Sequence, residues 1–177
     1  YCAGSVCSPT RASIITGQVP ARTGCTQYHG SIRGTELCFA EVLSKHGYET
    51  FFTGKWHVGG KTAEEAGFQT ALGMASSAKN PQDPKATRQI TRNTLDFLSK
   101  QTLETSFMAY VSYHAVHKPL LEKQALVDKY QSKLTTRPPK AGLPKGLETE
   151  GKLKNKQIQD DRSASAPLTR AFLTFYF

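Results

Sequence analysis

The sequence lacks several features that define common protein classes. No run of about 18 apolar residues occurs, so we expect no membrane-spanning helix. No Cys-x-x-Cys pair exists, which argues against zinc-ribbon and thioredoxin-like sites. The Cys-x5-Arg loop of tyrosine phosphatases is missing too, because Ser13 stands where its arginine would follow Cys7. No charged segment leads into an apolar one, so we expect no signal peptide within these residues, and a signal peptide upstream of Tyr1 stays open.

Acidic residues are scarce, with 14 Asp and Glu against 23 Lys and Arg and a formal net charge of +9. The excess is spread along the chain, at +3 in residues 1–61, +2 in residues 62–133 and +4 in residues 134–177. Nucleic-acid-binding proteins usually concentrate basic residues in one stripe with aromatic side chains. The nearest such feature is the Lys-rich stretch 152–156, which we interpret as a solvated surface loop. We therefore expect no nucleic-acid partner.

The length of 177 residues indicates one domain or a piece of one. The chain opens on Tyr1 and stops on an apolar stretch, so we expect both ends to lie inside a longer polypeptide. Its four cysteines allow two disulfides, but a chain of this size does not need them for stability.

Signals for helices and strands alternate along the chain. The predicted helices cover residues 9–16, 36–45, 83–100 and 122–132. The predicted strands cover residues 48–53 and 106–113, which are rich in β-branched and aromatic side chains. Residues 58–82 show no periodicity and are expected to form a loop. Residues 134–177 are rich in proline and charge and are expected to form a loop or a poorly ordered tail.

The boundaries of these elements rest on particular residues. Pro9 favours the first turn of a helix that Gly17 ends, and Thr35 is expected to cap the second helix. In the third helix we expect the core to be faced by Ile90, Leu95 and Leu98. The alternation predicts an α/β fold with a mostly parallel sheet.

Side chains that can bind anions or transfer protons follow the ends of the predicted strands. Lys55 and His57 follow the first strand, and His114 and His117 follow the second. Ligands bind beyond the carboxyl ends of strands in such sheets, and helix N-termini, here near Cys7, favour anions. A thiol nucleophile, a lysine and histidines together indicate covalent catalysis on a phosphate or sulfate ester. Each residue alone has an ordinary structural interpretation, so only the combination points to a site.

Three segments carry a resemblance to a known family. Residues 7–17, CSPTRASIITG, contain Cys-x-Pro-x-Arg followed by Ala and Thr-Gly. Residues 47–57, GYETFFTGKWH, end in Gly-Lys-Trp-His, and residues 117–119 form a His-x-Pro element. In this order and spacing they resemble the type I, formylglycine-dependent sulfatases over roughly residues 1–130.

The resemblance implies an alkaline-phosphatase-like α/β fold, present here as an incomplete N-terminal fragment of the catalytic domain. Residues 1–133 are assigned to that domain, and the basic residues 134–177 stay unassigned. The family also leads us to expect a periplasmic, secreted or lysosomal location.

The resemblance further implies a mechanism. A formylglycine-generating or equivalent maturation enzyme would oxidise Cys7 to formylglycine, whose hydrate has two hydroxyls. One hydroxyl would attack sulfur to form a covalent sulfo-enzyme, and the other would expel sulfate. Arg11 would hold the formylglycine, Lys55 would bind the sulfate and the leaving oxygen, and His57 would orient or deprotonate the diol. His117 would contact the sulfate ester and help to protonate the leaving group.

The family also implies a divalent cation, usually calcium, held in part by Cys7 as formylglycine. The remaining ligands, which the family takes from an Asp-Asp pair and an Asp-Asn pair, are expected outside this chain. The adjacent pair Asp160-Asp161 is interpreted as solvated loop charge. By motif position His117 rather than His114 is the matched histidine, and His29 and His46 are interpreted as structural.

Three functional hypotheses follow. The leading one is an arylsulfatase-like sulfuric ester hydrolase acting on a sulfated carbohydrate or an aryl sulfate. A second is a phosphonate or phosphate monoester hydrolase of the same superfamily, and a third is a catalytically inactive truncated fragment.

Overall fold

The computed structural model describes residues 2–73, 80–115, 117 and 121–136. The chain divides into two compact units, and each is described by itself. The first unit comprises Tyr1–Ser77 and Ala86–His114, and the second comprises Ala78–Lys85 and Ala115–Phe177. The predicted tail lies outside the described residues from residue 137 onward, and so do the Lys-rich stretch and Asp160-Asp161.

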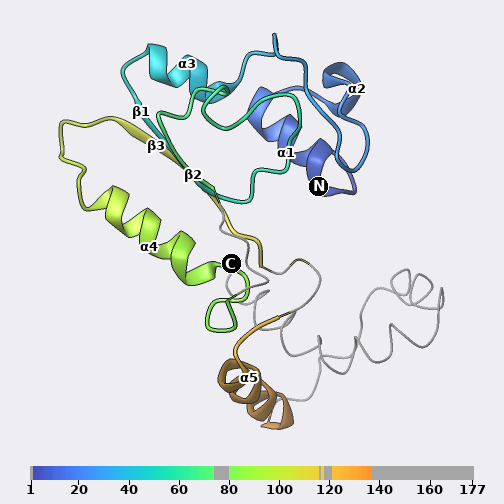
Figure 1. The fold of residues 1–177 in the computed structure, drawn as a ribbon, viewed down its shortest axis with the longest axis vertical. Coiled ribbons are helices and arrows are strands. Elements are labelled where there is room, and N and C mark those ends of the chain that lie inside the picture. The colour runs from blue at the N-terminus through green and yellow to red at the C-terminus, as the bar shows by residue number, and fades with distance from the viewer. Residues whose placement is uncertain (1, 74–79, 116, 118–120, 137–177) are drawn as a thin grey trace. The chain divides into compact units, whose positions relative to one another are not determined.

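A three-stranded parallel sheet forms the centre of the first unit (Figure 1). Its strands are β1 (Glu49–Gly54), β2 (Thr70–Gly73) and β3 (Phe107–Ser112), in the order β2-β1-β3. Gly54 is paired with Gly73 on one side and with Ser112 on the other. The carboxyl ends of all three strands therefore meet at one edge, and the predicted parallel α/β sheet is confirmed.

The strand β2 corrects the prediction that residues 58–82 form only a loop. This strand is four residues long, and its sequence Thr-Ala-Leu-Gly lacks the alternation that marks a half-buried strand. Its place at the edge of the sheet comes from parallel pairing with β1, from Phe51 opposite Thr70 to Gly54 opposite Gly73. Long-range pairing, rather than local sequence, produces this strand.

The first unit contains the helices α1 (Cys7–Thr16), α2 (Pro20–Thr23), α3 (Phe39–Lys45) and α4 (Thr87–Leu98). In Figure 1, α4 lies on one side of the sheet, and α1 and α3 lie on the other. The second unit contains α5 (Gln124–Thr136), which confirms the predicted helix in that region. None of the described helices is long and apolar enough to cross a membrane.

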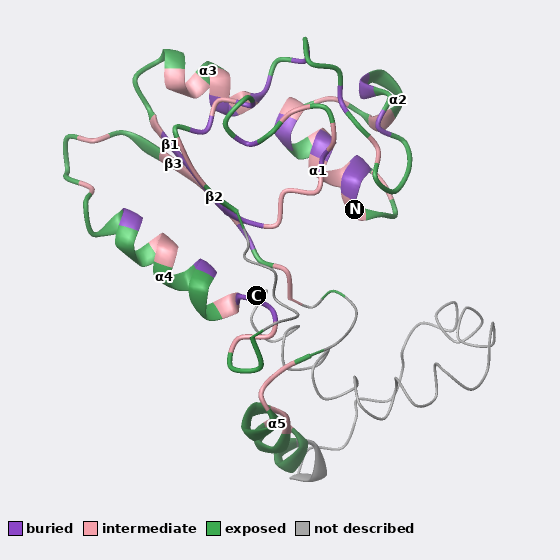
Figure 2. Cartoon of the chain, viewed as in Figure 1, coloured by how far each residue is buried: buried purple, intermediate pink, exposed green. Residues whose placement is uncertain are grey.

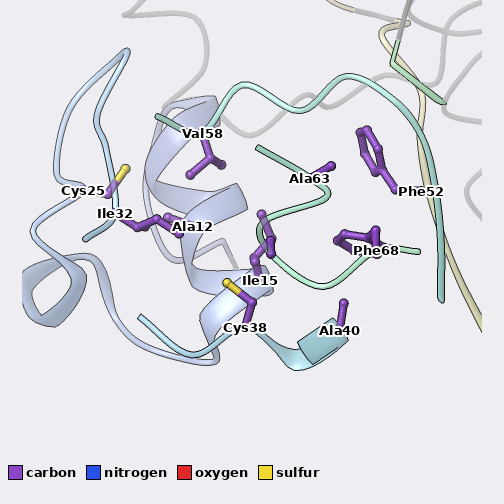
Figure 3. Close-up of a cluster of buried hydrophobic side chains, with 11 residues drawn as sticks. Ala12, Ile15, Cys25, Ile32, Cys38, Ala40, Phe52, Val58, Ala63 and Phe68 are labelled. Carbon is purple, nitrogen blue, oxygen red and sulfur yellow. The ribbon is translucent and has the colours of Figure 1, made fainter. Parts of the chain in front are cut away.

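The aromatic side chains of β1 serve both faces of the sheet. Neighbouring residues in a strand point to opposite faces, so Phe51 and Phe52 are buried on different sides. Phe52 joins a cluster from α1, α3 and the loops, which Figure 3 shows converging around Ile15 and Phe68. Phe51 stacks on Phe97 of α4, with their ring centroids 4.3 Å apart. Both helical layers are thereby packed against β1.

The buried face of α4 differs in part from the prediction. Ile90 is buried as expected, but Leu95 is 59% exposed and Leu98 is 40% exposed. The buried residues of the helix are instead Ile90 and Phe97, seven residues or two turns apart, and Figure 2 shows that only part of α4 is buried. Phe97 gains the stack with Phe51, which fixes the rotation of the helix and leaves the two leucines in solvent.

The start of α3 also differs from the prediction. Thr35 lies in a turn and does not cap the helix, which begins at Phe39 after Cys38. The backbone N–H of Cys38 donates to the carboxylate of Glu41 at 2.9 Å, the reciprocal bond that a capping box requires. That bond satisfies the backbone donor of Cys38, so Cys38 is the N-cap in place of Thr35. The helix begins at Phe39 and not at the predicted Glu36.

The cysteines are all free, and two of them are core residues. Cys25 and Cys38 are fully buried, and burial raises the pKa of both thiols, that of Cys38 to about 11. Such thiols carry little thiolate and are unreactive. Cys7 is only half-buried, so it differs chemically from the two core cysteines.

Candidate active site

The helix α1 begins at Cys7, the residue that the sequence predicts to carry the nucleophile. Cys7 is its first residue and follows Val6 in extended conformation, while Gly17 ends the helix in a left-handed conformation, as predicted. Within the helix, Thr10 Oγ1 donates to the carbonyl of Gly4, which precedes the helix, at 2.7 Å. This bond folds the incoming segment against the first turn. Cys7 therefore lies at a helix N-terminus, where unpaired N–H groups favour an anion.

The guanidinium of Arg11, one helical turn after Cys7, ties α1 to the carboxyl ends of β1 and β3. Its Nη1 donates to the backbone carbonyl of Lys55 at 2.8 Å and also to the hydroxyl of Ser112. Ser112 Oγ in turn donates to the same Lys55 carbonyl at 2.8 Å. We call these three groups the Arg11 network. They join three elements that are far apart in the sequence at one edge of the sheet.

Gly54 is required at this edge for two reasons. Its φ of +108° is a conformation that side-chain-bearing residues rarely adopt. A Cβ atom there would also collide with the backbone carbonyl of Ser112. The close approach of β1 and β3 allows the N–H of Lys55 to donate to that carbonyl at 2.8 Å. Gly54 thus sets the path by which the chain leaves β1 and presents Lys55 and His57.

A second set of contacts runs from Cys7 toward solvent. Cys7 Sγ lies 3.0 Å from His57 Nδ1, and His57 Nε2 lies 3.2 Å from His29 Nδ1. The ring of Tyr28 packs edge-on against both imidazoles, at centroid distances of 4.0 Å to His29 and 5.1 Å to His57. We call Cys7, His57 and His29 the His57 network. It gives a proton at residue 7 a hydrogen-bonded path through an imidazole.

The electrostatics of Lys55 suit an anionic ligand. Burial lowers the pKa of its ammonium, and the nearby Arg11 lowers it further, whereas a thiolate at Cys7 raises it. A half-buried cation without full hydration gains from a bound anion, which restores the lost interactions of the charged form. Lys55 and the N-terminus of α1 are therefore both suited to the same negative group.

Four of the five predicted site residues belong to one assembly in the first unit. Cys7 contacts His57, and Arg11 donates to the backbone carbonyl of Lys55. The ammonium of Lys55 also interacts electrostatically with Cys7 and Arg11. The fifth, His117, belongs to the second unit and is described only there.

The remaining histidines occupy three different settings. His114 follows β3 by two residues in the first unit. His46 ends α3, with its Nδ1 at 2.8 Å from the carbonyl of Val42, which agrees with a structural role. His29, by contrast, reaches His57, although the sequence suggested a structural role for it too.

Two members of these networks, Ser112 and His29, were not among the predicted site residues. Ser112 is the last residue of β3, so its position at a carboxyl strand end was a usable signal. His29 follows no predicted strand and stands 28 residues from His57, so no local pattern marks it.

The described residues do not assemble a calcium site. Calcium takes six to eight oxygen ligands as a rule, and within the described ranges no group of three or more His, Cys, Asp or Glu residues is arranged so that it could hold a metal ion. Residue 7 is the one predicted ligand that lies in this part of the chain. We therefore derive no step of the reaction through a metal.

Comparison with known proteins identifies the family of this site. Residues 1–160 match the family model described as Sulfatase. The chain belongs to the sulfatase family. Sulfatase relatives include the ulvan-active sulfatase of Formosa agariphila, 44% identical over 55 residues, which are 31% of this chain and 11% of that protein. Human N-acetylgalactosamine-6-sulfatase is 26% identical over 167 residues, covering 68% of this chain and 32% of the relative.

Solved structures support the same conclusion about the fold. The structure of BT4656 in complex with its substrate D-glucosamine-2-N,6-O-disulfate matches with a TM-score of 0.64 and 21% identity, over 76% of this chain and 30% of that one. Ps i-CgsB in complex with k-i-k-neocarrahexaose matches with a TM-score of 0.63 and 20% identity, over 96% of this chain and 42% of that one. The predicted sulfatase resemblance and alkaline-phosphatase-like fold are confirmed. The chain spans about a third or less of the relatives' own length.

Proposed function

We propose that this chain is part of a sulfuric ester hydrolase that cleaves sulfate monoesters, with residue 7 as the nucleophile. The observation that carries the proposal is the joint placement of Cys7, Arg11, Lys55 and His57 in a chain of the sulfatase family. The thiol lies at a helix N-terminus, an imidazole nitrogen lies 3.0 Å from it, and the half-buried ammonium of Lys55 interacts electrostatically with the thiol. These are a nucleophile position, a proton acceptor and an anion-binding group.

The proposal includes oxidation of Cys7 to formylglycine by a maturation enzyme. When hydrated, that group supplies two hydroxyls, one that attacks sulfur as the ester oxygen leaves and one that loses its proton as the carbonyl re-forms and sulfate departs. Residue 7 suits this chemistry because it is half-buried rather than sealed in the core, unlike Cys25 and Cys38. The chain keeps an acceptor, His57 Nδ1, at the position where a hydroxyl proton has to be removed.

Each remaining residue has a role that follows from its contacts. Arg11 holds the first turn of α1 on the sheet edge, so that residue 7 and Lys55 stay at a fixed separation. Lys55 binds the sulfate and stabilises the negative charge that develops on the leaving oxygen. His57 orients residue 7 and accepts its proton. We also propose that His117 protonates the leaving group, on the basis of its motif alone.

Sulfated carbohydrate is the proposed substrate class. It is supported by the ulvan-active sulfatase, the N-acetylgalactosamine-6-sulfatase and the structure with a glucosamine disulfate among the similar proteins. Aryl sulfates are the alternative substrate class, since other similar proteins are named arylsulfatase G and arylsulfatase A. We further propose a calcium ion held in part by residue 7, with its other ligands beyond the described residues. A periplasmic, secreted or lysosomal location belongs to the same proposal.

The direct test is mass spectrometry of the peptide that contains residue 7, purified from the native host. We expect the mass change from CH2–SH to an aldehyde, and unmodified cysteine throughout would refute the formylglycine mechanism. The full-length protein should hydrolyse para-nitrophenyl sulfate, and Cys7→Ala should abolish this. Faster turnover of a matched aryl phosphonate would instead favour the phosphonate hydrolase, and turnover by the full-length protein but not by the 177-residue chain would favour the inactive fragment.

A further inference from the structure

His29 lies next to the proposed catalytic histidine although it belongs to a different loop. Its Nδ1 lies 3.2 Å from His57 Nε2, while the other nitrogen of His57 lies 3.0 Å from Cys7 Sγ. Both nitrogens of His57 are therefore engaged along one line from residue 7 to His29. A half-turn of the imidazole about its Cβ–Cγ bond would move both nitrogens off their partners. The contact with His29 thus favours the ring orientation that presents Nδ1 to residue 7.

The loop of His29 is anchored although His29 itself is exposed. Cys25 and Ile32, on either side of it in the sequence, are 0% and 3% exposed and belong to the main core (Figure 3). A loop held at both ends within so few residues has little freedom to move its central side chain. The position of His29 is therefore set by the core and not by surface contacts.

The loop of His29 is also joined to the loop of His57 through the backbone. The N–H of Gly59 donates to the carbonyl of Gly30 at 3.1 Å, and the N–H of Ile32 donates to the carbonyl of Gly59 at 3.0 Å. These bonds form an isolated parallel bridge between Ser31 and Gly59. Each bonded residue is within three positions of one of the two histidines. The two imidazoles are consequently fixed against each other by main-chain bonds.

Both histidines adopt a backbone conformation that costs free energy. Their φ values are +58° for His29 and +57° for His57, in the left-handed region that few residues other than glycine occupy. Strain of this kind concentrates at functional sites, where the surrounding structure maintains it. The edge-on contacts of Tyr28 with both rings add packing that holds the pair together.

We propose that His29 is a positioning residue that holds the His57 imidazole with Nδ1 toward residue 7. This assignment rests on the proposed function, since the orientation of His57 matters for catalysis only if residue 7 is the nucleophile. His29 does not touch residue 7 in the described contacts and acts through His57. Outer partners that orient a histidine in this way usually contribute about 10- to 100-fold at metal sites, and we take that range as the guide here.

The test compares two substitutions in the full-length protein. His29→Phe keeps an aromatic ring against Tyr28 and His57 but removes the hydrogen bond. His29→Asn keeps a polar atom close to the position of Nδ1. We expect His29→Phe to lower kcat for para-nitrophenyl sulfate about tenfold with KM nearly unchanged, at the low end of the range for outer partners. His29→Asn should restore kcat to within about threefold of the wild type.

The second readout does not need activity. In the 15N-histidine-labelled protein, long-range proton–nitrogen spectra report the bonding state of each ring nitrogen, and this chain contributes five histidines. The His57 ring signals should move in His29→Phe and stay in place in His29→Asn. His46→Phe, which removes a histidine bonded only locally to Val42, is the control and should change neither kcat nor the His57 signals.

These outcomes separate the two proposals. Unmoved His57 signals in His29→Phe, or equal losses of kcat in the Phe and Asn variants, would overturn the role of His29 while leaving the sulfatase proposal intact. Absence of sulfate ester hydrolysis in the wild type, with moved His57 signals in His29→Phe, would overturn the proposed function and leave the contact between the histidines established.

Discussion

The two networks that leave the first turns of α1 differ in what surrounds them. The Arg11 network connects a guanidinium to a backbone carbonyl and to the hydroxyl of Ser112, a buried residue at the end of a strand. The His57 network runs outward from half-buried Cys7 to exposed His29. Changes to the first should therefore appear as losses of stability, and changes to the second should appear mainly in chemistry. Substitutions in the two networks should separate this division through their effects on the free energy of unfolding.

The largest loss of stability is expected from Gly54→Ala, at the base of the Arg11 network. Alanine would be strained at φ +108°, and its Cβ would collide with the carbonyl of Ser112, forcing β1 and β3 apart. The two effects together should cost about 3 kcal/mol or more, measured by urea denaturation. Gly73→Ala is a matched control because Gly73 is paired with Gly54 in the sheet and a Cβ there meets no atom within 4 Å. Equal losses in the two variants would contradict the argument.

A smaller loss is expected from Arg11→Ala. The change removes a charged donor from the Lys55 carbonyl and from Ser112, and hydrogen bonds to charged groups contribute about 1.5–3 kcal/mol each at most sites. We expect a net loss of about 2 kcal/mol, because the Lys55 carbonyl keeps its bond from Ser112. Arg92→Ala, on the exposed face of α4, should change stability by less than about 0.5 kcal/mol. An Arg11→Ala variant as stable as Arg92→Ala would show that the Arg11 network does not hold the helix.

A still smaller loss is expected from Ser112→Ala, of about 1 kcal/mol. Arg11 keeps its 2.8 Å bond to the Lys55 carbonyl in this variant, so only the hydroxyl contacts disappear. Because Arg11 donates to the hydroxyl of Ser112, each single variant already loses that bond, so the Arg11→Ala, Ser112→Ala double variant should lose less than the sum of the single variants. A double-mutant cycle by urea denaturation measures that coupling, and strict additivity would mean that the two residues act independently.

The same comparison explains how much of the site was predictable from sequence. Local sequence signals lie close to all four predicted residues of the first unit. Pro9 indicates the first turn of α1, near Cys7 and Arg11, and Gly54 indicates the end of β1, before Lys55 and His57. The order of the motifs predicted the sulfatase family, and the match over residues 1–160 confirms it. Local markers therefore placed the ends of elements, which is where a parallel sheet gathers its functional groups.

Other features depended on contacts that no local pattern encodes. Ser112 meets Arg11 across 101 positions of sequence, and His29 meets His57 across 28. The short strand β2 exists because β1 offers it backbone partners. The rotation of α4 depends on the stack of Phe97 on Phe51, which no periodicity within the helix could reveal. Tertiary pairing supplied these features.

Lys55 takes part in both networks, because its backbone carbonyl accepts a bond from Arg11 and its ammonium interacts electrostatically with Cys7. Lys55→Met keeps the backbone bonds and most of the side-chain volume, so we expect no loss of stability. Burial lowers the pKa of the folded-state ammonium below 10.5, which means that the unfolded state holds this proton more tightly. The charged form therefore opposes folding at neutral pH. Removing it should raise the urea midpoint slightly, with solvent screening keeping the gain below about 1 kcal/mol.

The pH dependence gives this last prediction its sign. Wild-type stability should rise relative to Lys55→Met as pH increases from the lowered pKa of folded Lys55 toward 10.5, because the unfolded chain then releases its proton as well. Below that window the difference between the two proteins should be constant. Urea midpoints of both variants from pH 7 upward measure the effect. A Lys55→Met protein that is less stable than the wild type at neutral pH would show that the ammonium stabilises the fold. Lys55 would then be a structural residue like Arg11, and not a group whose charge is available to bind an anion.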